Sequence, residues 1–180
     1  MKYRQKGFTL LELMITVVVA IVLMAVAIPS FTNFIQNNRV SGVANELVTA
    51  LNFARSESVR RSESVELCVY NGNAAAPGCA AVDDWARGWV ARVASGPNTG
   101  TVLRVWEVET PPGVTLTRIQ AGGVTTRVQF NSLGAAESVA AGQRMLWRVQ
   151  GSNCTAGTAL ARMVETNRAG RSQVMDGVCV

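Results

Sequence analysis

The chain begins with a long apolar run that contains a single carboxylate. No charged residue lies between Leu13 and Ile28, and Thr16 is the only residue there with a hydroxyl. Counted from Phe8, the run is close to the roughly 20 residues that span a bilayer as a helix. The pattern therefore predicts a transmembrane or filament-core helix over residues 8–28, in which Glu12 is the exception.

Beyond Pro29 the apolar positions recur at spacings of three and four residues, as in an amphipathic helix. They are Val40, Val43, Leu47, Leu51 and Ala54. We expect residues 29–62 to continue the first helix, with a kink at Pro29 because proline removes an amide donor. A single helix from about Thr9 to about Arg60 would be about 78 Å long. Two separate helices that meet at Pro29 are the alternative.

From residue 63 onward, the period changes to the alternation that is typical of strands. Residues 65–70 alternate in this way, and turn residues follow them at 71–73 and 77–78. The further strands that we expect are residues 88–93, 102–108, 114–119, 125–130, 145–149, 159–164 and 173–178. One helix followed by many short strands predicts an α+β fold, in which antiparallel strands of residues 63–180 form a sheet on the helix.

The short leader before Phe8 ends at Gly7 and carries three cations, Lys2, Arg4 and Lys6. A secretory signal places its apolar stretch before the cleavage point, whereas a cut between Gly7 and Phe8 would leave the apolar helix on the mature protein. The run Gly7-Phe8-Thr9-Leu10-Leu11-Glu12 resembles the class III signal of type IV prepilins and pseudopilins. Residues 1–7 are then a leader peptide whose cations stay in the cytoplasm.

This resemblance implies a route of processing and assembly. A prepilin peptidase would remove residues 1–7 and methylate the new amine of Phe8, and the inner membrane would hold the helix until assembly. A carboxylate costs roughly 3 kcal/mol at the bilayer centre, and Glu12 would offset this by pairing with the Phe8 amine of a neighbouring subunit. Glu12 as a first-turn residue favoured by the helix dipole is one alternative. Cleavage after Ala25-Val26-Ala27, which would release a soluble protein, is another.

Charge and composition exclude several classes of function. Removing the three leader cations from the formal net charge of +5 leaves +2, which does not indicate nucleic-acid binding. The chain has no histidine, so it lacks Ser/His/Asp and Cys/His catalytic sets. We therefore expect no catalytic residues and no cofactor. Asp83-Asp84 lacks the spacing of a calcium loop, and we expect core positions for Trp85, Trp89, Trp106 and Trp147.

The chain has four cysteines, Cys68, Cys79, Cys154 and Cys179. An even number beyond a membrane signal indicates an oxidising compartment and two disulfides. Three connectivities exist in principle. Pairing Cys68 with Cys79 and Cys154 with Cys179 is the simplest, because each bond closes a modest loop and would stabilise the fold by about 3 kcal/mol. A zinc site is the alternative, but without histidine or a C-x-x-C spacing we expect no metal.

The order of the downstream motifs narrows the resemblance. It runs Leu67-Cys68, Cys79, Trp85-Ala86-Arg87-Gly88-Trp89-Val90, Leu103-Arg104-Val105, Phe130-Asn131-Ser132-Leu133-Gly134 and the tail Cys154…Gly170-Arg171…Cys179. Over nearly the whole chain, this order resembles the GspH/FimT family of minor pilins and pseudopilins, and within it the FimU-like minor pilins. The resemblance implies a type IV pilin-like fold and a low-abundance subunit that starts or caps a filament.

Three functions follow from this resemblance. The first, which we favour, is a structural minor pilin that primes or caps a type IV pilus at its tip, with other minor pilins and the major pilin as partners. Before assembly its domain would be periplasmic, on a single-pass anchor. The second is a GspH-like minor pseudopilin of a type II secretion system. The third is a FimT-like DNA-uptake receptor, with Arg162, Arg168 and Arg171 as candidate phosphate contacts. Such receptors carry Gly-Arg-x-Arg, whereas this chain reads Gly170-Arg171-Ser172-Gln173.

Overall fold

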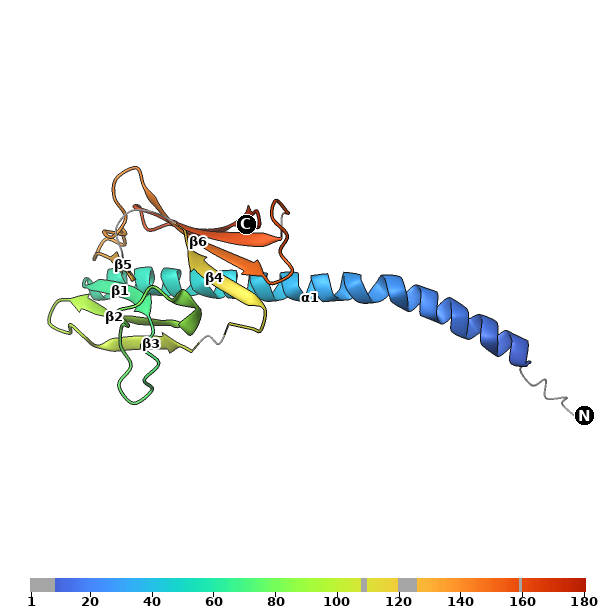
Figure 1. Cartoon of the computed structure of the whole chain (residues 1–180). Coiled ribbons are helices and arrows are strands. Elements are labelled where there is room, and N and C mark those ends of the chain that lie inside the picture. Colours follow the sequence, from blue (N-terminus) through green and yellow to red (C-terminus); the bar gives the residue numbers. More distant parts are fainter. Residues whose placement is uncertain (1–8, 108–109, 120–125, 159) are drawn as a thin grey trace, which may run out of the picture. The chain divides into compact units, whose positions relative to one another are not determined.

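The structure is a computed structural model of the chain (Figure 1). It describes residues 9–107, 110–119, 126–158 and 160–180, except for the side chains of residues 26–30. The chain forms two compact units, Met1–Ile35 and Gln36–Val180. The ends of three expected strands, at residues 108, 125 and 159, lie outside the described residues.

One helix, α1 (Leu10–Arg61), runs through both units. The helix continues through position 29, as we expected, and the alternative of two separate helices is not observed. The side chain of Pro29 lies outside the described residues, and the kink there stays a prediction. The helix ends at Arg61 because Ser62 has a φ of 55°, a left-handed value that an α-helix cannot continue. Within the described residues, no helix has both the length and the apolarity that crossing a membrane requires.

The first sheet contains β1 (Ser64–Val69), β2 (Trp89–Ser95), β3 (Val102–Trp106) and β5 (Arg127–Phe130) in the order β3-β2-β1-β5. All its pairs are antiparallel. A short helix, η1 (Trp85–Arg87), leads into β2. Side chains alternate between the faces of a strand. In β1, Val65 and Leu67 therefore enter the main core, while Glu66 and Cys68 face the other way.

The second sheet contains β4 (Val114–Arg118), β6 (Arg144–Gly151), β7 (Ala161–Asn167) and β8 (Ser172–Gly177) in the order β4-β6-β7-β8. These pairs are antiparallel too. Two four-stranded sheets therefore replace the one sheet that the pattern predicted. The reason is that β1 pairs with β5, which follows β4 in the chain, and alternation along a strand does not identify its partner.

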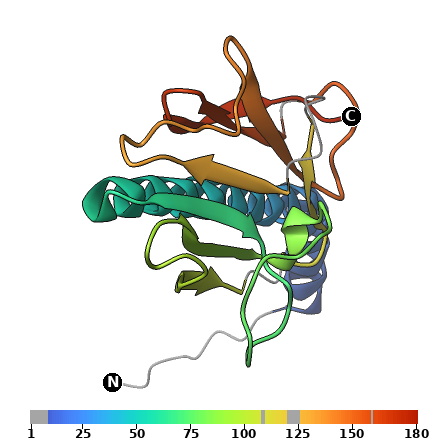
Figure 2. The ribbon, with the colours of Figure 1, turned by 90° about the vertical axis from the view of Figure 1, so that its left-hand side faces the viewer.

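A single core joins the helix to both sheets within residues 36–180. Figure 2 shows the two sheets on different sides of this part of α1. The predicted stripe of the helix is buried, and its members are at most 3% exposed: Val40, Val43, Leu47, Leu51 and Ala54. They pack in one cluster with side chains from the first sheet, such as Phe130, and from the second sheet, such as Trp147. The apolar stripe that the sequence predicted is thus the face of the helix that packs against the two sheets.

Candidate functional site

The N-terminus of α1 is held by a reciprocal pair of hydrogen bonds. The Thr9 amide and hydroxyl both donate to Oε2 of Glu12 at 3.2 Å, and the Glu12 amide donates to the Thr9 hydroxyl at 3.2 Å. This is a capping box, in which the residue before the helix and the third helical residue satisfy each other's amides. The Glu12 side chain is also exposed, so its carboxylate can accept a further cation. Gly7 and Phe8 lie outside the described residues.

Thr9 is a residue to which our sequence analysis gave no role. Its signal was present as Thr9-x-x-Glu12 directly before an apolar run, which is the sequence form of a capping box. The contact supports the alternative in which Glu12 serves the first helical turn. It does not test the pairing of Glu12 with a neighbouring amine, because both roles use the same exposed carboxylate.

The first unit exposes apolar side chains on every side of the helix. Between Leu10 and Met24, the large apolar side chains are 49% to 77% exposed. Phe31 and Phe34 are 63% and 62% exposed. A helix that is apolar all round is stable only when something covers it, and a surface of this kind marks a membrane or protein interaction site.

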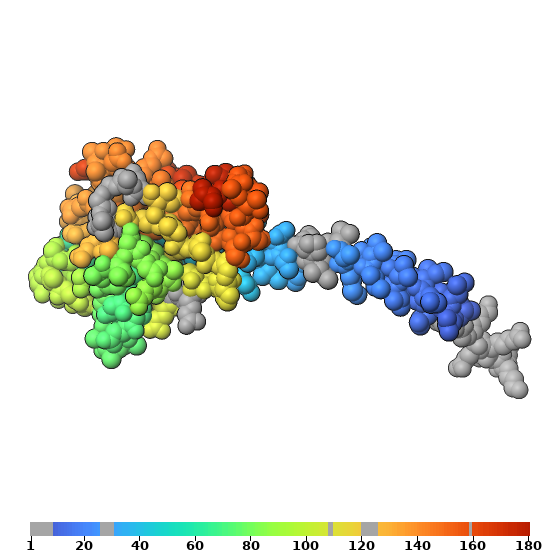
Figure 3. All heavy atoms as spheres, in the orientation of Figure 1, coloured from blue at the N-terminus to red at the C-terminus, as the bar shows by residue number. Residues whose placement is uncertain are grey.

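The two disulfides join Cys68 to Cys79 and Cys154 to Cys179, with Cα–Cα distances of 5.4 and 5.5 Å. The first closes the base of the loop after β1, which projects from the surface of the domain in Figure 3 (green). The second ties the C-terminal end to the segment between β6 and β7. Both bonds therefore hold segments that have little sheet pairing of their own.

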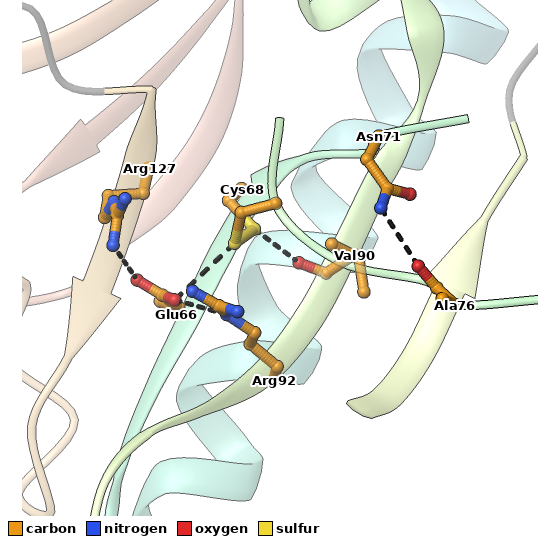
Figure 4. Close-up of a disulfide and its surroundings, with 8 residues drawn as sticks. Glu66, Cys68, Asn71, Ala76, Val90, Arg92 and Arg127 are labelled. Carbon is orange, nitrogen blue, oxygen red and sulfur yellow. Dashed lines mark hydrogen bonds and ion pairs between the residues drawn. A yellow bond between two sulfur atoms is a disulfide. The ribbon is translucent and has the colours of Figure 1, made fainter. Parts of the chain in front are cut away.

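A buried carboxylate lies beside the first disulfide (Figure 4). Glu66 is 2% exposed, and it pairs with Arg92 of β2 at 2.6 Å and with Arg127 of β5 at 3.1 Å. Its Oε1 lies 3.5 Å from the Cys79 sulfur. Glu66, Cys68 and Cys79 are the only described residues that cluster like metal ligands. They do not fit a metal, because the sulfurs are joined to each other and two guanidinium groups hold the carboxylate.

The aromatic and acidic candidates have structural roles. Trp85 and Trp147 are fully buried and meet edge to face, with ring centroids 5.2 Å apart. Asp83 accepts hydrogen bonds of 2.8 Å from the Trp85 indole and from Arg118 of β4. Asp84 caps η1 by accepting a hydrogen bond from the Ala86 amide. Asp83 thus links η1 to the second sheet, while Asp84 stabilises the start of η1.

The structure does not bring the three candidate DNA contacts together. Arg162 lies in β7 and pairs with Asp176 of β8 at 3.1 Å. Arg168 and Arg171 are exposed in the β7–β8 turn, at the other end of the strand. At about 3.3 Å per residue, Arg162 and Arg168 are about 20 Å apart along the strand direction. The turn thus presents two arginines to solvent, whereas the charge of Arg162 is balanced by Asp176.

Solved structures similar to this one are those of a type IV minor pilin. Two crystal structures of the minor pilin FimU from Pseudomonas aeruginosa align with TM-scores of 0.59 and 0.54, each at 18% sequence identity. The first alignment covers 79% of this chain and 92% of FimU, and the second covers 75% and 91%. The chain therefore has the expected type IV pilin fold, with a long helix and antiparallel strands.

Sequence comparisons match both parts of the chain. Type IV major fimbrial proteins FimA of Dichelobacter nodosus are 40% identical over 75 residues and 39% identical over 75 residues. The aligned region is 42% of this chain and only about two fifths of these relatives' length. The family model of the prokaryotic N-terminal methylation motif matches residues 2–28. The model of the type II transport protein GspH matches residues 43–170, and the chain therefore belongs to the GspH family.

Proposed function

We propose that the protein is a structural minor pilin, which primes or caps a type IV pilus at its tip. Residues 8–28 anchor it in the inner membrane before assembly, with the globular domain in the periplasm. Prepilin peptidase removes residues 1–7 and methylates the amine of Phe8. In the filament, Glu12 pairs with the Phe8 amine of a neighbouring subunit, and other minor pilins and the major pilin cover the apolar helix.

The observation that carries this proposal is the exposed apolar surface of α1 in the first unit. Its large side chains from Leu10 to Met24 are all at least 49% exposed. Burial of apolar surface contributes about 25 cal/mol per Å², so lipid and then neighbouring helices are favourable surroundings for it. The methylation motif over residues 2–28 supports the same use of this segment, since the matched residues include the leader and the apolar run.

Mass spectrometry and a deletion strain test the proposal together. Intact mass of the membrane-extracted protein should show the loss of Met1–Gly7 and a methyl group on Phe8. The deletion strain should lose surface pili and twitching, and the complemented strain should carry the protein in its sheared pili. A mature protein that starts at Ile28, or normal piliation without the gene, would contradict the proposal.

A minor pseudopilin of a type II secretion system is the second candidate. The family description supports it, because the model that matches residues 43–170 is named for a type II transport protein. The same deletion strain distinguishes the two candidates. Loss of secreted proteins with intact pili would favour the pseudopilin, whereas loss of pili with intact secretion favours the minor pilin.

A DNA-uptake receptor has the least support of the three. Arg162 is paired with Asp176, and position 173 is Gln where the Gly-Arg-x-Arg element has its second arginine. Phosphate contacts would then come from Arg168 and Arg171 alone, and such binding falls steeply with salt. Transformation of the deletion strain at the wild-type rate would exclude this role.

A further inference from the structure

Three segments that are distant in the sequence meet at one end of the domain. They are the last turns of α1, the turn after β5, and the turn between β7 and β8. The Arg55 Nε donates to the Gly134 carbonyl at 3.1 Å, and the Ala136 amide donates to the Arg168 carbonyl at 2.9 Å. Gly170 lies so close to the Gly134 carbonyl oxygen that a side chain there would collide with it. The three segments therefore form one continuous surface.

This surface presents arginines and aliphatic side chains together, and we call it the turn patch: Arg55, Val59, Leu133, Arg168 and Arg171. Leu133 is 84% exposed and Val59 is 50% exposed. Arg168 and Arg171 are exposed, and Arg55 is partly buried. In Figure 2 the end of α1 and the loop after β5 lie at the same end of the domain.

The arginines of the turn patch, Arg55, Arg168 and Arg171, form no salt bridge with any carboxylate in the part of the chain that the structure describes. Glu137, on the same turn as Leu133, accepts a hydrogen bond from the Asn131 side chain. Two members of the patch, Arg55 and Val59, also line an open hollow of about 440 Å³ on the exposed face of α1. The surface is thus cationic and carries apolar groups next to a depression.

We propose that the turn patch docks an acidic segment of a neighbouring filament subunit, and that this segment carries an exposed aliphatic side chain. The inference rests on the proposed function, because the partner that it describes is another subunit of the same filament. Carboxylates would pair with Arg168 and Arg171, and an aliphatic side chain would cover Leu133 and Val59. Protein interfaces combine an apolar centre with a polar rim, and arginine is enriched in them.

Duplex DNA fits the turn patch less well than an acidic protein segment does. Its phosphates could bind the arginines, but they offer nothing apolar to Leu133, whose side chain is 84% exposed. The hydrogen bond from the Ala136 amide to the Arg168 carbonyl also joins the two turns before binding, which lowers the entropy cost of docking any partner. Of these two features, the exposed Leu133 is the one that favours a protein partner over DNA.

Binding to defined probes tests the inference. Full-length mature protein in a non-ionic detergent is titrated with a labelled acidic peptide that contains leucines, at near-physiological salt. The comparison probes are the same peptide with serine for leucine and a short DNA duplex. We expect the leucine peptide to bind about tenfold more tightly than the serine peptide, because it buries apolar surface against Leu133. Equal affinities, or tighter binding of the duplex, would overturn the inference.

Variants assign the binding to the turn patch. Leu133→Ser should remove the advantage of the leucine peptide, whereas Val180→Ser, at a residue 69% exposed outside the patch, should leave it unchanged. Joint Arg168→Gln and Arg171→Gln should weaken both peptides about tenfold, and joint lysine substitution should retain most of the affinity. Unchanged binding by Leu133→Ser or by the glutamine variant would overturn the inference.

Filament recovery separates this inference from the proposed function. If the wild-type protein is present in sheared pili but binds neither peptide, the inference about the turn patch is wrong and the minor-pilin function stands. If the protein is absent from pili, the proposed function is wrong, and the partner named here is wrong with it.

Discussion

Replacing Gly170 with alanine tests how the β7–β8 turn is held. Gly170 has a φ of 77°, and an L residue in that region costs about 1–2 kcal/mol. An added Cβ would also collide with the Gly134 carbonyl oxygen, which belongs to the backbone and cannot rotate away. Overpacking of this kind costs about 1–3 kcal/mol more. We therefore expect Gly170→Ala to lower the free energy of unfolding by about 2–5 kcal/mol.

Gly100 provides a matched control for this prediction. Its φ is 88°, but an added Cβ there meets no described atom within 4 Å, so Gly100→Ala should cost only the conformational 1–2 kcal/mol, roughly. Denaturant unfolding of the full-length protein, with both disulfides intact, measures both variants by tryptophan fluorescence. All four tryptophans lie in the second unit, and three are fully buried. If both variants lose the same free energy of unfolding, the turns that contain Gly134 and Gly170 can move apart without cost, and the reasoning is refuted.

Three further predictions follow from the structure. Glu12→Ala should reduce the amount of the protein recovered in sheared filaments. Thr9→Ala should remove only the helix cap, at a cost of about 1 kcal/mol, and leave the recovered amount unchanged. Equal recovery of the two variants would show that Glu12 acts only in the cap. Joint serine substitution of Cys154 and Cys179, which are 25 residues apart, should lower the free energy of unfolding by about 3.5 kcal/mol, and denaturant unfolding that shows no loss would contradict this. The hydrogen bond from Arg60 lowers the pKa of Glu57 in the folded protein. The ionised Glu57 therefore contributes its full stabilisation of the fold above the ordinary glutamate pKa, and this contribution is lost as the pH falls through the folded-state pKa. Glu57→Gln should reduce the loss of unfolding free energy at acidic pH by less than about 1 kcal/mol. An unchanged dependence of the unfolding free energy on pH would contradict this prediction.

The features that could be read from the sequence depend on residues close together in the chain. The apolar run and the amphipathic stripe from Val40 to Ala54 predicted α1, because helical periodicity is a local property. Cysteine spacing favoured the pairing that the structure contains, because short loops close at the lowest entropy cost. Turn residues placed most strands to within a few residues. The capping box at Thr9 and Glu12 was readable on the same grounds, although we assigned no role to Thr9.

Features that join distant segments depended on the folded structure. The strands form two sheets because β1 pairs with β5, and local alternation carries no information about such a partner. Glu66 reads as an exposed strand position, yet it is buried and forms ion pairs with arginines from two other strands. Arg162 and Arg168 are close in sequence but lie at opposite ends of β7, while Arg55 and Gly134 are in contact. Long-range packing sets these contacts. The charged and apolar groups involved come from different segments, and they meet only once the domain has folded.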